Sequence, residues 1–163
     1  GSEQILSLMI DLKTPLHPTI DRLIAKLEKH PEVFDPAVNP YAVRVVITGS
    51  RPDPSAFGEF PHFISFDGFI DVEYTPEQLE RVALISEPFC RYAKWKGGPE
   101  PLPAQEKQVI EQLIAKSHKA GKPIRFWCSP DNAVAWETFR KLGIDIINTD
   151  QPEACTLYFQ QNP

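Results

Sequence analysis

The chain has 163 residues and a formal net charge of −5, with 42% hydrophobic and 24% charged residues. This length suffices for one domain with a buried core, and the composition excludes a disordered or fibrous chain. No apolar run reaches the roughly 20 residues of a membrane-spanning helix, and the negative charge argues against DNA or RNA as a partner. We therefore expect a soluble globular domain.

Short apolar runs alternate along the chain with longer amphipathic segments. In chain order they predict a strand at 6–11, a helix at 18–29, strands at 43–48 and 63–66, a short helix opening at Thr75, a weak strand at 83–86, a helix at 103–120, a strand at 124–128, a helix at 131–142, a strand at 144–148 and a helix at 152–159. Strands that are rich in Val and Ile and separated by helices imply parallel pairing. The predicted fold class is α/β.

The chain ends and the cysteines give weaker signals. Gly1 and Ser2 resemble the remnant of a cleaved tag, and no signal peptide follows them. The compartment stays open, and a secreted or periplasmic origin would require a signal that was removed. Cys90, Cys128 and Cys155 are far apart and in no CxxC pairing, which predicts small buried hydrophobic side chains rather than a disulfide framework or a zinc site.

Two parallel architectures fit the alternation, an open doubly wound sheet and a closed β/α barrel. The glycine-rich phosphate-binding turns that favour a nucleotide-binding open sheet are absent from the sequence. Each predicted strand ends in a polar or aromatic cluster, such as Asp11–Lys13 or Trp127–Ser129. Barrels build their active sites from such carboxyl ends of strands, which favours the barrel without excluding the open sheet.

Several stretches resemble a known superfamily. Gly121–Trp127 reads GKPIRFW and Leu142–Asp150 reads LGIDIINTD; both look like the last two β/α units of the glycerophosphodiester phosphodiesterase and phosphatidylinositol phospholipase C-like barrels. Ile10–Thr14, IDLKT, is similar to the third-strand motif, which reads DLKT in the sphingomyelinase D enzymes. Shorter stretches at 48–52, 66–68, 85–86 and 92–95 resemble a bacterial phospholipase C-like subgroup, so the resemblance covers nearly the whole chain.

The resemblance implies a TIM-type (β/α)8 barrel that is truncated to six β/α units. Residues 3–163 would form a single domain that lacks the two N-terminal units, where the family carries its catalytic histidines and an acidic metal-binding pair. The sequence has four histidines, and none follows the family's strand-end pattern: His17, His30, His62 and His118. No residue of this chain is therefore expected to be catalytic.

The same resemblance assigns roles at the strand ends. It makes Asp11 a ligand of a divalent cation, Mg²⁺ or Ca²⁺, a role that suits a carboxylate oxygen. Lys13 lies on the same side of an extended chain as Asp11 and would neutralise a phosphate oxygen. The remaining candidates for substrate contact are Arg51, Asp67 and Trp127, with Glu87 and Asn148 as weaker ones.

Each candidate also has a plain structural explanation as a solvated strand end, a turn, a helix cap or a core side chain. Taken with the resemblance, these residues imply a metal-dependent phosphoric diester hydrolase-like domain for a small-molecule or lipid phosphodiester, inactive as this chain alone. Two alternatives stay open: a non-catalytic barrel that binds a phosphorylated ligand, and a flavodoxin-like regulatory module.

Overall fold

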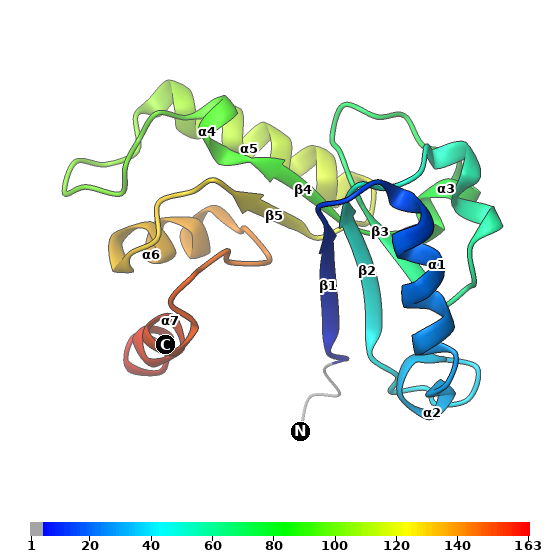
Figure 1. The fold of residues 1–163 in the computed structure, drawn as a ribbon. Coiled ribbons are helices and arrows are strands. Elements are labelled where there is room, and N and C mark those ends of the chain that lie inside the picture. Colours follow the sequence, from blue (N-terminus) through cyan, green and yellow to red (C-terminus); the bar gives the residue numbers. More distant parts are fainter. Residues whose placement is uncertain (1–4) are drawn as a thin grey trace. The chain divides into compact units, whose positions relative to one another are not determined.

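A computed structural model describes residues 5–163, which divide into two compact units. Of these residues, the first unit comprises 5–68 and 72–83, and the second comprises 69–71 and 84–163. Gly1 and Ser2, which we expected to be a tag remnant, lie outside the described residues. Each unit combines parallel strands with helices (Figure 1), so the predicted α/β class is confirmed.

The first unit is built on three parallel strands: β1 (Ser7–Leu12), β2 (Arg44–Gly49) and β3 (Ile64–Gly68). The register places Asp11 opposite Thr48 and Ile47 opposite Phe66. Because the strands are parallel, their carboxyl ends meet at one edge. In α/β proteins this is the edge outside which ligands bind.

Four helical segments complete the first unit: α1 (Leu16–Leu27), α2 (Pro31–Phe34), the 3-10 helix η1 (Pro54–Glu59) and α3 (Pro76–Arg81). Helix α1 contacts β1 and buries Ile20 and Leu27. Phe57 of η1 stacks on Phe66 of β3, with ring centroids 4.2 Å apart. The Thr75 hydroxyl accepts the Gln78 N–H and caps α3, as the sequence predicts.

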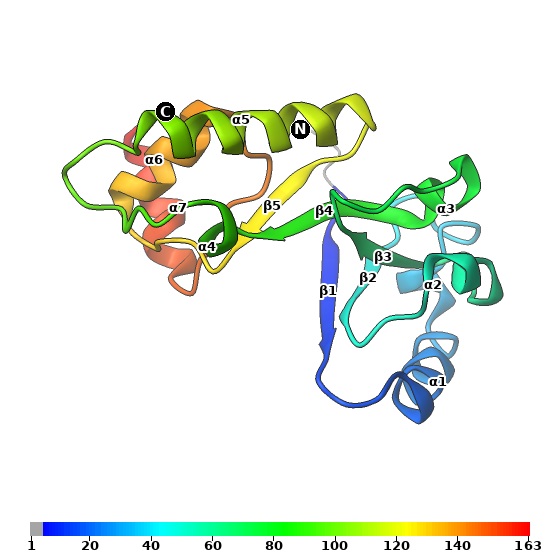
Figure 2. The same ribbon diagram turned by 90° about the horizontal axis from the view of Figure 1, so that it is seen from above.

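The second unit contains two strands and four helices: β4 (Val82–Pro88), whose first two residues are counted with the first unit, α4 (Phe89–Tyr92), α5 (Ala104–Lys119), β5 (Ile124–Trp127), α6 (Ala133–Leu142) and α7 (Pro152–Gln161). Strands β4 and β5 are parallel, with Ile85 opposite Ile124. Helix α5 runs alongside β5 in both views of the ribbon (Figures 1 and 2). Among the described helices, none is long and apolar enough to cross a membrane.

Aromatic rings form much of the second unit's core. Phe89 meets the rings of Phe126 and Phe139 edge to face, with centroids 6.2 and 5.3 Å away. Trp95 contacts Phe139 in the same way at 6.3 Å. Such pairs add stability beyond the area they bury, and they fix the segment after β4 against helix α6.

The expected barrel of six β/α units is wrong, because residues 5–163 form only five strands. The predicted strand at 144–148 is reduced to a single bridge between Ile146 and Arg125. The Asp145 carboxylate accepts the Ile124 N–H at 2.8 Å, and so takes a donor that a paired strand would bind through a backbone carbonyl. Gly143 ends α6 in the left-handed conformation at φ +82°, as expected from its position.

The cysteine expectation is also wrong for two of the three residues. Cys90 and Cys128 form a disulfide, with their Cα atoms 5.6 Å apart. Cys155 is free and buried, as predicted. The pairing was hidden in the sequence because parallel β4 and β5 bring together residues that are 38 positions apart.

Candidate functional site

Three polar side chains, those of Asp11, Thr48 and Asp67, lie on neighbouring strands near the carboxyl ends of the first unit's strands. Asp11 of β1 lies opposite Thr48 of β2, and Asp67 follows Phe66, the β3 partner of Ile47. Since residues at one level of a parallel sheet point to the same face, the three side chains share that face. The Thr48 hydroxyl donates to Asp67 Oδ2 at 2.8 Å.

Arg51 and Asp67, both predicted to contact the phosphate, contact each other. The Arg51 guanidinium donates to Asp67 Oδ1, and the two side chains are only 13% and 5% exposed. A buried carboxylate needs such a partner, because an unpaired charge in this environment is costly. The pair fastens the loop after β2 to the end of β3, which gives Arg51 a structural role.

Asp11 and Lys13 form a second, more accessible ion pair. Lys13 Nζ lies 2.5 Å from Asp11 Oδ2, and the side chains are 82% and 45% exposed respectively. As alternation along the strand predicts, both side chains lie on one side of the chain. This pair places a carboxylate and an ammonium within reach of solvent at the carboxyl end of β1.

Gly49 makes room for the Asp11 carboxylate. Its φ of +77° is in the left-handed region, and a Cβ at this position would collide with Asp11 Oδ1 and lie 2.6 Å from the Leu12 carbonyl oxygen. Any larger residue here would therefore displace the candidate cation ligand.

The first unit fits a divalent cation only with help from non-protein ligands. Among residues 5–163, no group of three or more His, Cys, Asp or Glu side chains could hold a metal ion. Asp67 already accepts from Thr48 and Arg51, which leaves Asp11 as the accessible carboxylate. Magnesium is commonly held by one or two carboxylates, substrate phosphate oxygens and water, and Asp11 suits that arrangement.

Glu87, a weaker candidate, is a buried hydrogen-bond acceptor in the second unit. It is 1% exposed, and it accepts the Ile70 N–H at 2.7 Å and the Tyr92 hydroxyl at 2.8 Å. Burial, together with the hydrogen bond to Glu87, raises the pKa of Tyr92 to about 12. These contacts hold residues 69–71 and helix α4 to β4, so Glu87 acts as a structural acceptor here.

In the second unit, Asn148 is part of a hydrogen-bond network, whereas Trp127 is partly exposed at the end of β5. Asn148 Oδ1 accepts from the Arg125 guanidinium, which also donates to Ser86 Oγ at 3.1 Å. Trp127 ends β5 and is 43% exposed, so it is not a core residue. Sequence analysis missed Arg125, although a charged residue inside an apolar strand is itself a signal of a polar partner.

Each of the four histidines pairs with a carboxylate. Among them, His17 is the second residue of α1, after the segment that follows β1, and its Nδ1 lies 2.8 Å from Asp21 Oδ2. His62 bonds Asp35 at 2.8 Å. The Ala37 N–H and His62 bonds lower the pKa of Asp35, which marks a local ion pair rather than an acid–base centre.

Comparison with known proteins adds no family to this geometry. No protein-family model matches the chain, and no curated protein or solved structure matches it. The functional conclusion therefore rests on the residues themselves.

Proposed function

We propose that this protein binds a phosphodiester at the carboxyl end of β1, as a phosphoric diester hydrolase-like domain, with Mg²⁺ or Ca²⁺ between Asp11 and the phosphate. The observation that carries the proposal is the exposed Asp11–Lys13 pair. Its carboxylate suits a divalent cation, and its ammonium suits a phosphate oxygen. A metal-bound phosphate would contact both groups.

The contact between Asp11 and Lys13 makes cation and phosphate binding interdependent. With Nζ 2.5 Å from Oδ2, the ammonium occupies the side of the carboxylate that a cation would approach. A phosphate that attracts Lys13 uncovers Asp11, and a cation on Asp11 releases Lys13. Each ligand should therefore increase the affinity for the other.

Hydrolysis needs more than this pair. A bound divalent cation would polarise a phosphoryl oxygen, while cleavage also needs a base for the nucleophile and an acid for the leaving group. Among the described histidines, His17 is the one that lies at the start of the helix after β1, and it can fill one of these roles only. We therefore propose phosphodiester binding without turnover for this chain.

Calorimetry with glycerophosphoglycerol, with and without MgCl₂, tests this proposal. We expect Mg²⁺ to raise the affinity, Asp11→Asn to abolish the Mg²⁺ effect, and Lys13→Gln to weaken binding by about tenfold or more. Lys29→Gln, an exposed change beyond α1, is the matched control and should bind as wild type. Phosphorus NMR should show no cleavage of the diester.

The outcomes separate the alternatives. If Lys13→Gln weakens binding while Asp11→Asn and Mg²⁺ change nothing, the site is a metal-free phosphate-binding site. If both variants bind as wild type, the proposal is wrong. Cleavage of the diester would show that the chain supplies its own acid and base.

A further inference from the structure

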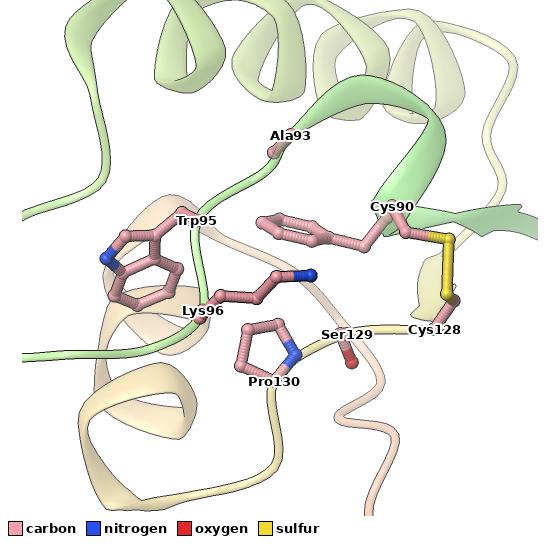
Figure 3. A pocket seen from close by; sticks show the side chains of 8 residues that line it. Cys90, Ala93, Trp95, Lys96, Cys128, Ser129 and Pro130 are labelled. Carbon is pink, nitrogen blue, oxygen red and sulfur yellow. A yellow bond between two sulfur atoms is a disulfide. The ribbon is translucent and has the colours of Figure 1, made fainter.

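A pocket lies in the second unit, beyond the carboxyl ends of β4 and β5 (Figure 3). It has a volume of about 150 Å³. Helix α4 and the segment that follows it form one wall, and the residues after β5 form the other. The pocket therefore has the location at which α/β proteins place their ligands.

Lys96 is the one charged residue among those that line this pocket. Figure 3 shows its side chain reaching across the pocket, with Nζ directed toward the side of Ser129 and the disulfide. Within residues 5–163, Lys96 has no carboxylate within 4.0 Å and no hydrogen-bond partner. Lys96 is exposed, and no carboxylate of these residues balances its charge, unlike that of Lys13.

Apart from Ser129, whose hydroxyl donates to the Phe126 carbonyl at 3.3 Å, the rest of the lining is apolar and held in place. Phe89 is 1% and Trp95 is 9% exposed, and the Trp95 indole N–H donates to the Glu100 carbonyl at 2.8 Å. The Glu106 carboxylate accepts the Trp95 backbone N–H at 3.1 Å. On the opposite side, the Cys90–Cys128 disulfide ties α4 to the end of β5. Because these side chains are already fixed, a ligand would lose little free energy in ordering them when it binds.

The size and chemistry of the pocket define a ligand class. A cavity of about 150 Å³ holds one benzene ring, and Phe89, Trp95 and Pro130 offer such a ring apolar contact. Lys96 supplies a cation for the anionic group of such a ligand. We propose that this pocket binds a small organic anion with a single ring, and that Lys96 is its counter-ion. This site is separate from the one on β1.

Benzoate is the probe, because it carries a ring and a carboxylate but no phosphate, which keeps this test independent of the proposed phosphodiester site. Titration of ¹⁵N-labelled protein should shift the Trp95 indole signal in a saturable manner, with a Kd of about 1 mM or tighter. Benzamide, which is neutral and of the same shape, should bind at least about tenfold more weakly.

Lys96→Gln should weaken benzoate binding by about tenfold or more and leave benzamide binding unchanged. Lys94→Gln removes a charge two residues away that does not line the pocket, so it should bind benzoate as wild type. Retained benzoate binding in Lys96→Gln, equal affinity for benzoate and benzamide, or no saturable shift would each overturn the proposal. Unchanged indole shifts in the free variants confirm that they are folded.

Discussion

The two units carry different chemistry at the carboxyl ends of their strands. In the first unit, charges pair with each other: Arg51 with Asp67 in the interior, and Lys13 with Asp11 at the surface. In the second unit, the buried carboxylate Glu87 accepts bonds from uncharged donors, and a disulfide joins α4 to the residue that follows β5.

The difference shows two ways to stabilise a buried acceptor at a strand end. Asp67 accepts from one guanidinium and one hydroxyl, so a cation balances its charge, whereas Glu87 accepts from a backbone N–H and a phenol, both uncharged. Removing a partner should therefore cost more in the first unit than in the second. The ion pair at the surface should contribute least to stability, which leaves it available for a ligand.

Arg51→Leu should have the largest effect, because it leaves Asp67 buried without its cation. We expect a loss of about 3–5 kcal/mol in the free energy of unfolding, measured by urea denaturation. Arg22→Leu, an exposed arginine on α1, is the control and should change stability by at most about 0.5 kcal/mol. A loss below about 1 kcal/mol in Arg51→Leu would show that the guanidinium does not stabilise Asp67.

Replacing both Cys90 and Cys128 by serine should rank next. The disulfide closes a loop across a sequence separation of 38, and the entropy of such a loop corresponds to about 3–4 kcal/mol. The same loss should appear in wild-type protein under a reductant, and Cys155→Ala should respond to reductant as wild type does. Equal stability with and without reductant would contradict this account.

Tyr92→Phe should cost about 1–3 kcal/mol, because Glu87 Oε2 loses its hydroxyl donor. It also tests a pH effect. Burial and the Glu87 bond raise the pKa of Tyr92 from 10.0 to about 12, so between these values the unfolded chain loses the proton first. Wild-type stability should fall as pH rises from about 10 to about 12.

In Tyr92→Phe this part of the pH dependence should disappear, whereas Tyr41→Phe, at a residue that is 60% exposed, should keep it. Ultraviolet titration should also show one of the four tyrosines ionising later than the others. If all four ionise together in the folded protein, the burial of the Tyr92 hydroxyl is refuted.

Asp11→Asn and Lys13→Gln should have the smallest effect on stability, below about 0.5 kcal/mol each, because exposed ion pairs contribute little. Both variants should nevertheless lose phosphodiester binding or its Mg²⁺ dependence. A stability loss above about 1 kcal/mol in either variant would assign the pair a structural role instead.

Local signals in the sequence predicted most elements of the fold. The helix start at Thr75, the helix end at Leu142 and the amphipathic pattern of α5 depend on residues within one or two turns, which is why they could be predicted. The strand at 144–148 failed because a side chain, that of Asp145, took the backbone donor of Ile124. The apolar pattern of a sequence does not show whether a side chain will accept a backbone N–H in place of a neighbouring strand.

The sites depend on contacts between distant residues, so fewer of their features were predictable. Strand alternation placed Asp11 beside Lys13 because the two are neighbours in the chain. The pairing of Arg51 with Asp67 spans 16 positions. Because of it, Arg51, which the sequence predicted to contact phosphate, is the buried ion-pair partner of Asp67. The pocket that Lys96 lines could not be predicted for the same reason, because its walls come from two segments that follow different strands.

Reciprocal titration tests the central claim most directly. The affinity for glycerophosphoglycerol is measured at zero and saturating Mg²⁺, and the affinity for Mg²⁺ is measured at zero and saturating glycerophosphoglycerol. We predict that each ligand raises the affinity for the other by the same factor, and that this factor falls to one in Asp11→Asn. A wild-type factor of one would contradict the proposed site at Asp11 and Lys13.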